Sequence, residues 1–256
     1  MSVHSPMFRA AIMGEIETVR LELERNVDIN SFNADPTVGS PWTPLQFAVH
    51  SGCLRVQLGR PQNNTMVEFL LQNGADPNLK DNEGLSPVHI CSDFGNMPYL
   101  RLLVQYKADV NLTNQDGKTP LHICASKGNV PYAEFLILRG AHINSLDNDD
   151  RTPLIAAVTV PGNSAIVEWL IFNGANILLR GVDGHNAESL SITLHHDAIT
   201  AVIRAAVLIR EKCVAFASGS VERLGSASRV NSIDLLAMHM ILNMVLYERD
   251  EILSTI

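Results

Sequence analysis

Apolar and polar positions follow a pattern that recurs along most of this chain. The segments KTPLHICASKGN (118–129) and LSPVHICSDFGN (85–96) match closely and lie 33 residues apart. In both, a hydroxyl residue precedes a proline, which is a common start of a helix, and compact apolar residues follow. The pattern returns in RTPLIAAVTVPGN from Arg151 and in WTPLQFAVHSG from Trp42. Each copy therefore predicts one short helix.

A glycine follows the apolar residues of each copy. Because glycine readily adopts the left-handed conformation that ends helices, we expect the short helix to end at these glycines: Gly52, Gly95, Gly128 and Gly162. A second apolar stretch comes next with helical spacing, as in Tyr99, Leu102 and Leu103. The pattern therefore predicts pairs of helices.

A second landmark keeps the same period. NGADPN from Asn73, YKADVN from Tyr106, RGAHIN from Arg139 and NGANIL from Asn173 recur at intervals of 33, 33 and 34 residues, and a degenerate copy, RNVDIN, begins at Arg25. An extended loop is expected after each copy. One helix pair cannot bury its own apolar face, so the units are expected to stack.

These motifs resemble the ankyrin-repeat family, whose TPLHxA signature stands here as Thr119 to Cys124. The resemblance implies an all-α ankyrin-repeat solenoid of five to six helix-turn-helix units with extended loops, plus a C-terminal helix. We expect an array over 1–214, with units at about 5–41, 42–84, 85–117, 118–150, 151–184 and 185–214. The sixth unit lacks the TPL triplet, as is usual for a repeat that caps an array.

The chain after the array has a different composition. Residues 215–231 are rich in glycine and serine and predict a linker, and residues 232–256 predict a helix that is apolar around most of its circumference. Such a helix needs something to cover it. It could dock on the last repeats as an extra cap, pair with a partner or a second copy, or lie on a membrane surface. The acidic, lysine-poor sequence favours the first two alternatives.

One insertion interrupts the repeats at 53–62. We expect it to lengthen the turn between two helices and to project Arg55 and Arg60. It is either a tolerated insertion or a functional loop.

Charge and cysteine content restrict the class of protein. The 256 residues carry a formal net charge of -8, with no long run of lysine or arginine, which argues against direct nucleic-acid binding. Four scattered cysteines and a polar start predict an intracellular protein, cytoplasmic and compatible with the nucleus. The longest apolar stretch, 233–246, is too short to span a bilayer, so no transmembrane segment is expected.

Few residues suggest chemistry of their own. His89 with Cys91, and His122 with Cys124, are interpreted as structural, because the resemblance implies that this histidine connects adjacent loops. The run 195–197, His-His-Asp, is interpreted as a polar turn. No catalytic, cofactor or metal site is predicted. Asn111 resembles the asparagine that some ankyrin repeats present to a hydroxylase, although a hydrogen bond within the loops is the interpretation that we favour.

The resemblance implies that a protein partner binds the loop tips and the exposed end of the first helix, on a concave face. The positions that correspond are Trp42, His50, Lys80, Asn82, Glu83, Leu85, Asp93, Phe94, Thr113, Gln115, Asp116, Lys118, Ser126, Lys127, Asn148, Asp149, Arg151, Thr159 and Val160. Trp42 and Phe94 are the expected anchors, because aromatic side chains often dominate binding energy. The alternative for each is that it packs on a neighbouring loop.

The sequence thus predicts a non-catalytic intracellular scaffold for protein–protein interaction. The alternative is a substrate-recognition adaptor whose C-terminal helix recruits a larger complex, such as a ubiquitin ligase or a signalling assembly.

Overall fold

The computed structural model describes residues 6–33, 41–59 and 64–217, with side chains up to 209. This part of the chain consists of paired helices joined by extended loops and contains no strand, which confirms the all-α prediction. Within the same residues, no helix has the length and apolarity needed to cross a membrane. The predicted helix at 232–256 and most of the predicted linker lie outside the described residues.

The described residues form two compact units. The first comprises those of residues 1–124 and 131–142, and the second those of 125–130 and 143–256. Within the second unit, the Asn163 side chain binds the backbone of residues 125 and 126. Its side-chain N–H groups donate to the carbonyls of Ala125 at 3.3 Å, Ser126 at 3.0 Å and Ala157 at 3.1 Å.

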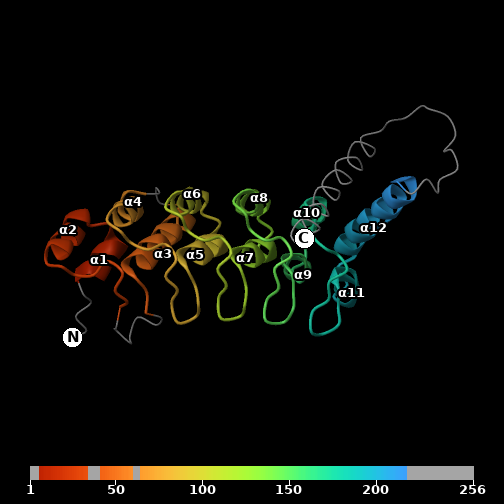
Figure 1. Ribbon diagram of the computed structural model, residues 1–256, viewed down its shortest axis with the longest axis horizontal. Helices are drawn as coiled ribbons and strands as arrows, with labels where there is room; N and C mark the ends of the chain where they lie inside the picture. The colour runs from red at the N-terminus through yellow and green to blue at the C-terminus, as the bar shows by residue number, and fades with distance from the viewer. Residues whose placement is uncertain (1–5, 34–40, 60–63, 218–256) are drawn as a thin grey trace, which may run out of the picture. The chain divides into compact units, whose positions relative to one another are not determined.

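The first unit contains four helix pairs in two layers. One layer holds the first helix of each pair: α1 (Pro6–Met13), α3 (Pro44–Gln57), α5 (Pro87–Phe94) and most of α7 (Pro120–Ser126). The other holds α2 (Ile16–Glu24), α4 (Thr65–Gln72), α6 (Met97–Gln105) and all but the first residue of α8 (Val130–Leu138). Figure 1 shows the loops of this unit projecting beyond the first layer, away from the second.

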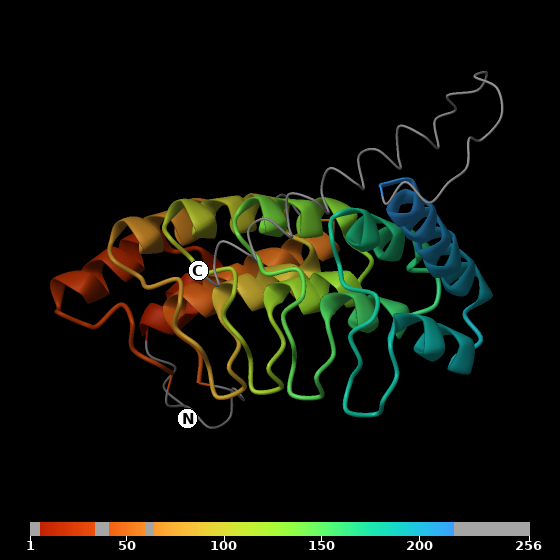
Figure 2. The same cartoon turned by 45° about the vertical axis from the view of Figure 1, so that its right-hand side comes forward.

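The second unit contains two helix pairs: α9 (Pro153–Val158) with α10 (Ser164–Phe172), and α11 (Ala187–Thr193) with α12 (Asp197–Ala217). The first helices of the two pairs pack on each other, α9 on α11, and so do the second helices, α10 on α12. Figure 2 shows the long loop that leads into α11 extending on the side of α9 and α11.

Side-chain caps start the first helices. Thr43 begins α3, where its hydroxyl accepts from the Gln46 backbone N–H at 3.3 Å while Oε1 of the Gln46 side chain accepts from the Thr43 N–H at 2.8 Å. Thr152 caps α9 through its hydroxyl in the same way. In the sixth pair, which lacks the TPL triplet, Asn186 replaces the hydroxyl residue and accepts from the Ser189 N–H at 2.8 Å. An asparagine cap therefore preserves a helix start that the motif no longer marks.

The core lies between the two layers of each unit. Leu103, Leu121 and Leu136 are fully buried in the first unit, as are Leu154, Ile166 and Ile203 in the second. The small residues at the motif positions leave little space between the first helices. Each pair thus buries its apolar face against its neighbours, as expected for stacked repeats.

Gly52 does not end the first helix of its pair, and α9 ends at Val158, four residues before Gly162, so both predictions are wrong. The helix α3 continues through Gly52 to Gln57, whereas Gly95 ends α5 with a left-handed φ of 70°. A Cβ at Gly52 would lie 2.6 Å from Cε2 of Tyr99, which is closer than atoms can approach. Gly52 is therefore required by the packing of α6 on α3.

Two other expectations also need correction. Residues 53–57 of the insertion lengthen α3 and do not form a turn; Arg55 is exposed on this helix, and Arg60 lies outside the described residues. At the other end, α12 runs to Ala217, so residues 215–217 are helical and do not belong to the predicted linker. In both places the helix extends past the repeat pattern.

Candidate partner-binding surface

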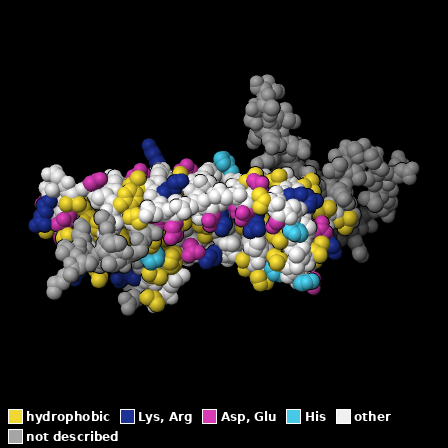
Figure 3. All heavy atoms as spheres, turned by 90° about the horizontal axis from the view of Figure 1, so that it is seen from below, with side chains coloured by type: hydrophobic (Ala, Val, Ile, Leu, Met, Phe, Trp, Pro, Cys, Tyr) yellow, Lys and Arg dark blue, Asp and Glu magenta, His cyan; other side chains and the backbone are white. Residues whose placement is uncertain are grey.

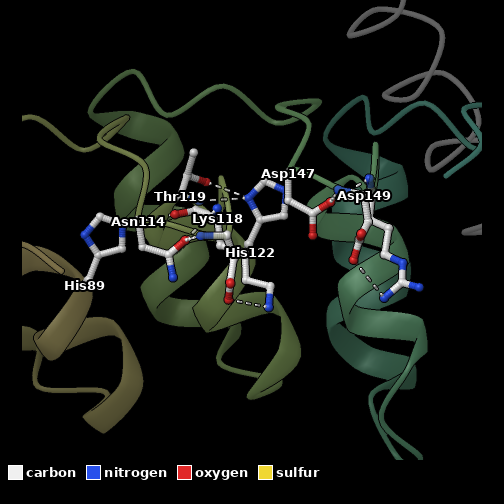
Figure 4. Close-up of polar contacts among 9 residues, drawn as sticks. His89, Asn114, Lys118, Thr119, His122, Asp147 and Asp149 are labelled. Carbon is white, nitrogen blue, oxygen red and sulfur yellow. Dashed lines mark hydrogen bonds and ion pairs between the residues drawn. The ribbon is translucent and has the colours of Figure 1, made fainter. Parts of the chain in front are cut away.

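Each projecting loop is folded around one side chain. In the first unit, Asp81 Oδ1 accepts from the N–H groups of Glu83 at 2.9 Å and Leu85 at 2.8 Å. Asn114 accepts in the same way from the N–H groups of Asp116 and Lys118, at 3.0 and 2.8 Å. Figure 4 shows Asn114 beside Lys118. These bonds hold the loop tips in one conformation without help from a partner.

Neighbouring loop tips are joined within the first unit. The Gln115 N–H donates to the Glu83 carbonyl at 2.9 Å, and the Gln115 side chain donates to the Asn82 carbonyl. The Lys80 ammonium group donates to the Thr113 carbonyl, also at 2.9 Å. Adjacent tips therefore form one continuous ledge.

Asparagines form a second series of bonds at the base of the loops. The Asn78 amide donates to the Lys107 carbonyl at 3.3 Å and accepts from the Asp109 N–H at 2.7 Å. Asn111 likewise donates to the Gly140 carbonyl and accepts from the His142 N–H, both at 2.9 Å. The preferred interpretation of Asn111, a hydrogen bond within the loops, is therefore what the structure contains. Hydroxylation of Asn111 stays the alternative, which mass spectrometry of the purified protein would check.

The motif histidine connects a helix to the next loop. Ser86 N–H donates to Nδ1 of His89 at 3.2 Å, so Nε2 carries the proton and donates to the Lys118 carbonyl at 3.1 Å. The Thr119 N–H donates to Nδ1 of His122 in the same way, at 3.1 Å (Figure 4). The structural interpretation of His89 is confirmed, because both of its ring nitrogens are engaged.

A row of aromatic rings lies on the first unit beside the loop tips. The ring of His50 lies 4.8 Å from that of Trp42 and 5.4 Å from that of Phe94, both edge to face. Trp42 also contacts the buried Phe47 at 5.3 Å, and its Nε1 donates to Asp81 Oδ2 at 2.7 Å. All three rings of the row are partly exposed. Burial lowers the pKa of His50, which favours the neutral form of its ring.

Trp42 therefore does pack on a neighbouring loop, as the alternative interpretation had it. Its bond to Asp81 was not predicted, although Asp81, Asn114 and Asp147 recur with a period of 33 residues and could have been recognised as turn residues. The ring of Phe94 contacts that of His50 and makes no bond to a loop like that of Trp42 among the described contacts.

The other predicted positions of the first unit line this ledge and row. Exposed side chains belong to Lys80, Asn82, Glu83, Asp93, Thr113, Gln115 and Asp116, and those of Leu85 and Lys118 are partly exposed. Figure 3 shows the loop tips, where acidic and basic side chains intermingle. The ledge thus presents mixed charge next to aromatic carbon.

The predicted positions of the second unit form a separate surface. Asn148, Asp149, Thr159, Val160 and Lys127 are exposed, and Ser126 and Arg151 partly so. The Arg151 guanidinium lies 3.3 Å from Asp183 Oδ2 and 3.8 Å from Asp149 Oδ2. A hydrogen bond from the His185 N–H lowers the pKa of Asp183, and the nearby Arg151 guanidinium lowers it further. Polar and charged groups therefore dominate this surface.

Groups that could do chemistry are buried or dispersed. Cys53, Cys91 and Cys124 are free and buried, and burial raises the pKa of the Cys91 and Cys124 thiols far above the ordinary value. These two thiols therefore stay protonated and unreactive at neutral pH. His195 and His196 lie in the turn between α11 and α12, where Nδ1 of His196 donates to the Val158 carbonyl at 2.9 Å. Among the described residues, no three potential ligands are grouped to hold a metal ion.

Comparison with known families identifies the repeat. A family model of ankyrin repeats, spanning three copies, matches residues 54–147 and 107–181. Together the two matches run from 54 to 181, which is half of the 256 residues. The chain belongs to the ankyrin-repeat family, whose members bind protein partners.

The curated proteins include one informative relative. E3 ubiquitin-protein ligase KEG from Arabidopsis thaliana is 32% identical to this chain over 88 residues. That match covers 34% of this chain and 4% of the plant protein. The chain thus corresponds to only a small part of this relative's length.

Proposed function

We propose that this chain is a non-catalytic, cytoplasmic protein-binding module that holds a protein partner on the loop tips and first helices. The observation that carries this proposal is the partly exposed row of Trp42, His50 and Phe94 beside the joined loop tips of the first unit. Aromatic side chains that are already ordered lose little entropy when they bind. The family supports a protein as the ligand.

The energetics of such a surface depend on the aromatic row. Rings packed edge to face supply apolar area that a partner can cover. The Asp81 carboxylate orients the indole of Trp42, while the hydrogen-bonded tips of 80–85 and 113–118 present charged groups at its rim. This combination, aromatic carbon surrounded by polar groups, is typical of interface hot spots.

Affinity purification with mass spectrometry would first identify the partner. Phe94→Ala should then weaken binding of the partner by more than about 1 kcal/mol, and so should the double variant with Trp42→Ala. Phe69→Ala is the matched control, because Phe69 is a partly exposed aromatic of the second layer, on α4. Equal affinity of the double variant and the wild type, with thermal unfolding of both recorded, would remove the proposal.

A second candidate is a substrate-recognition adaptor. The similarity to part of a ubiquitin ligase favours it. Here the repeats would bind the substrate while the region after 214 recruits the rest of the complex. Pull-downs with and without residues 215–256 distinguish the two candidates, because a plain binding module keeps its partners when that region is deleted and an adaptor loses one group of them.

A further inference from the structure

The last helix pair of the second unit has an uncovered side, which we call the end face. It is formed by Leu178 in the loop, Ile192 on α11 and a stripe of α12. The exposed fractions of Leu178, Ile192 and Leu208 are 64%, 46% and 51%. These are large values for leucine and isoleucine in a folded repeat.

The register of the repeats shows what normally covers such a face. Ile192 occupies the position of Val158 in the preceding pair, which is fully buried. Leu178 occupies the position of Asn144, whose side chain reaches the next loop by donating to the Gly174 carbonyl at 3.4 Å and accepting from the Asn176 N–H at 2.8 Å. The end face is therefore the side on which a further repeat would stand.

Helix α12 extends this face. It has 21 residues, compared with 9 in α10. Its exposed stripe, Ala201, Arg204, Ala205 and Leu208, follows the i, i+3, i+4, i+7 spacing of one helical side. Arg204 is the charged member and donates to Glu188 Oε1 at 2.9 Å. The stripe is thus mainly apolar with one positive charge near its centre.

We propose that residues 232–256 of the same chain cover the end face, as a helix that runs antiparallel to α12. The connecting residues 218–231 number 14, and a glycine- and serine-rich chain of that length spans about 20 Å on average, which is enough to reverse the direction of the chain. Leu208 precedes the end of α12 by nine residues, so a symmetric hairpin would place Ile241 opposite it. The neighbouring Leu242 and Val245 supply further apolar area.

Charge also fits this occupant. Residues 232–256 carry four acidic residues, Asp234, Glu248, Asp250 and Glu251, and one basic residue, Arg249. In the same antiparallel register Glu248 would lie one turn beyond Arg204, the charged member of the stripe, whose guanidinium also bonds Glu188 Oε1 at 2.9 Å. Residues 232–256, which are mostly apolar and acidic near the C-terminal end, therefore complement the end face.

Hydrogen–deuterium exchange on the full chain tests this proposal. Amides in 235–250 should exchange at least about tenfold more slowly than those of an unstructured chain. Leu208→Asp and Ile192→Asp should each abolish this protection. Leu138→Asp on α8 is the matched control, because Leu138 is 75% exposed but lies in the first unit, and it should leave the protection unchanged.

A second variant guards against unfolding of the repeats. Ile241→Asp alters none of the described contacts, so the circular dichroism of the repeats should persist while protection of 235–250 disappears. Three results would overturn the proposal. The first is exchange of 235–250 at the unstructured rate in the wild type, and the second is protection that Leu208→Asp and Leu138→Asp affect alike. The third is protection that appears only with a dimer in light scattering, which would assign the end face to a second copy.

Discussion

A single position, three residues into the first helix, shows how different side chains perform one task. In α3 it is Gln46, which accepts from the N-cap N–H and donates to the Leu85 carbonyl of the next loop at 2.7 Å. In α5 it is His89, which makes the equivalent pair of bonds. Burial, together with the positive charge of Lys80, lowers the pKa of His89 to about 4, although its bond to the Lys118 carbonyl acts in the opposite direction.

This low pKa makes stability depend on pH. Below its ordinary pKa of 6.5, His89 binds a proton in the unfolded chain but not in the folded one until about pH 4. Unfolding therefore takes up a proton, and the free energy of unfolding should fall by about 2 kcal/mol between pH 7 and pH 5, and stay level above pH 7. Urea titrations across this range measure it.

His89→Gln provides the control, because Gln46 shows that glutamine can make both bonds without titrating. The variant should be about as stable as the wild type at pH 7 and less sensitive to acid. An unchanged acid dependence in this variant would mean that other groups cause it.

At the scale of the element, helix length is set by what packs against the helix. The helix α3 has 14 residues, whereas α5, α7 and α9 have 8, 7 and 6. In these shorter helices the chain turns after a few apolar residues. In α3 the corresponding glycine accommodates the Tyr99 ring and the helix continues.

Gly52→Ala should therefore destabilise the protein, although alanine is the better helix former. The added Cβ overlaps the buried Tyr99 ring, and overpacking of this kind costs about 1–3 kcal/mol. The helix propensity of alanine offsets about 0.5–1 kcal/mol of that cost. Thermal unfolding measures the net loss, with the exposed Gln57→Ala on the same helix as a control.

A Tyr99→Leu background tests the cause. If the ring is responsible, Gly52→Ala should cost less in that background than in the wild type, and the two substitutions should couple. Full additivity would show that Gly52 has another role.

At the scale of the whole molecule, the chain divides into two units, and each contains one of the two tryptophans. Trp42 lies in the first unit and Trp169, on α10, in the second. Repeat proteins couple mainly through nearest neighbours, so distant parts can differ in stability. Fluorescence can therefore follow each unit separately.

We expect a core truncation to affect its own unit most. Ile203→Ala removes a fully buried side chain of the second unit, at a cost of about 2–5 kcal/mol. In the single-tryptophan variants Trp42→Phe and Trp169→Phe, it should shift the unfolding midpoint reported by Trp169 more than that reported by Trp42. Leu70→Ala in the first unit should do the reverse. Equal shifts in both reporters would mean that the chain unfolds as one block.

Much of the fold could be predicted because the motif residues act locally. A hydroxyl cap and a proline determine where α3 and α9 begin, and these bonds involve residues only three positions apart. The role of His89 followed from resemblance and is confirmed. The end of α3 was predicted wrongly, because Gly52 and Gly95 look alike in sequence and differ only in what lies beside them.

The candidate surface was predictable in position but not in detail. The loop tips recur with the repeat, so their exposed residues could be named in advance. The bond between Trp42 and Asp81 joins residues 39 positions apart and depends on how adjacent loops pack. The sequence pattern contains no signal for such a contact.

By itself, then, the sequence determined the repeat, the starts of the helices and the family, because each rests on residues close together in the chain or on their fixed period. Tertiary structure alone decided the length of α3, the orientation of Trp42 and the exposure of the end face on α11 and α12. The physical reason is the same in each case: what a glycine, an indole or a leucine does depends on whether a neighbouring repeat occupies the space beside it.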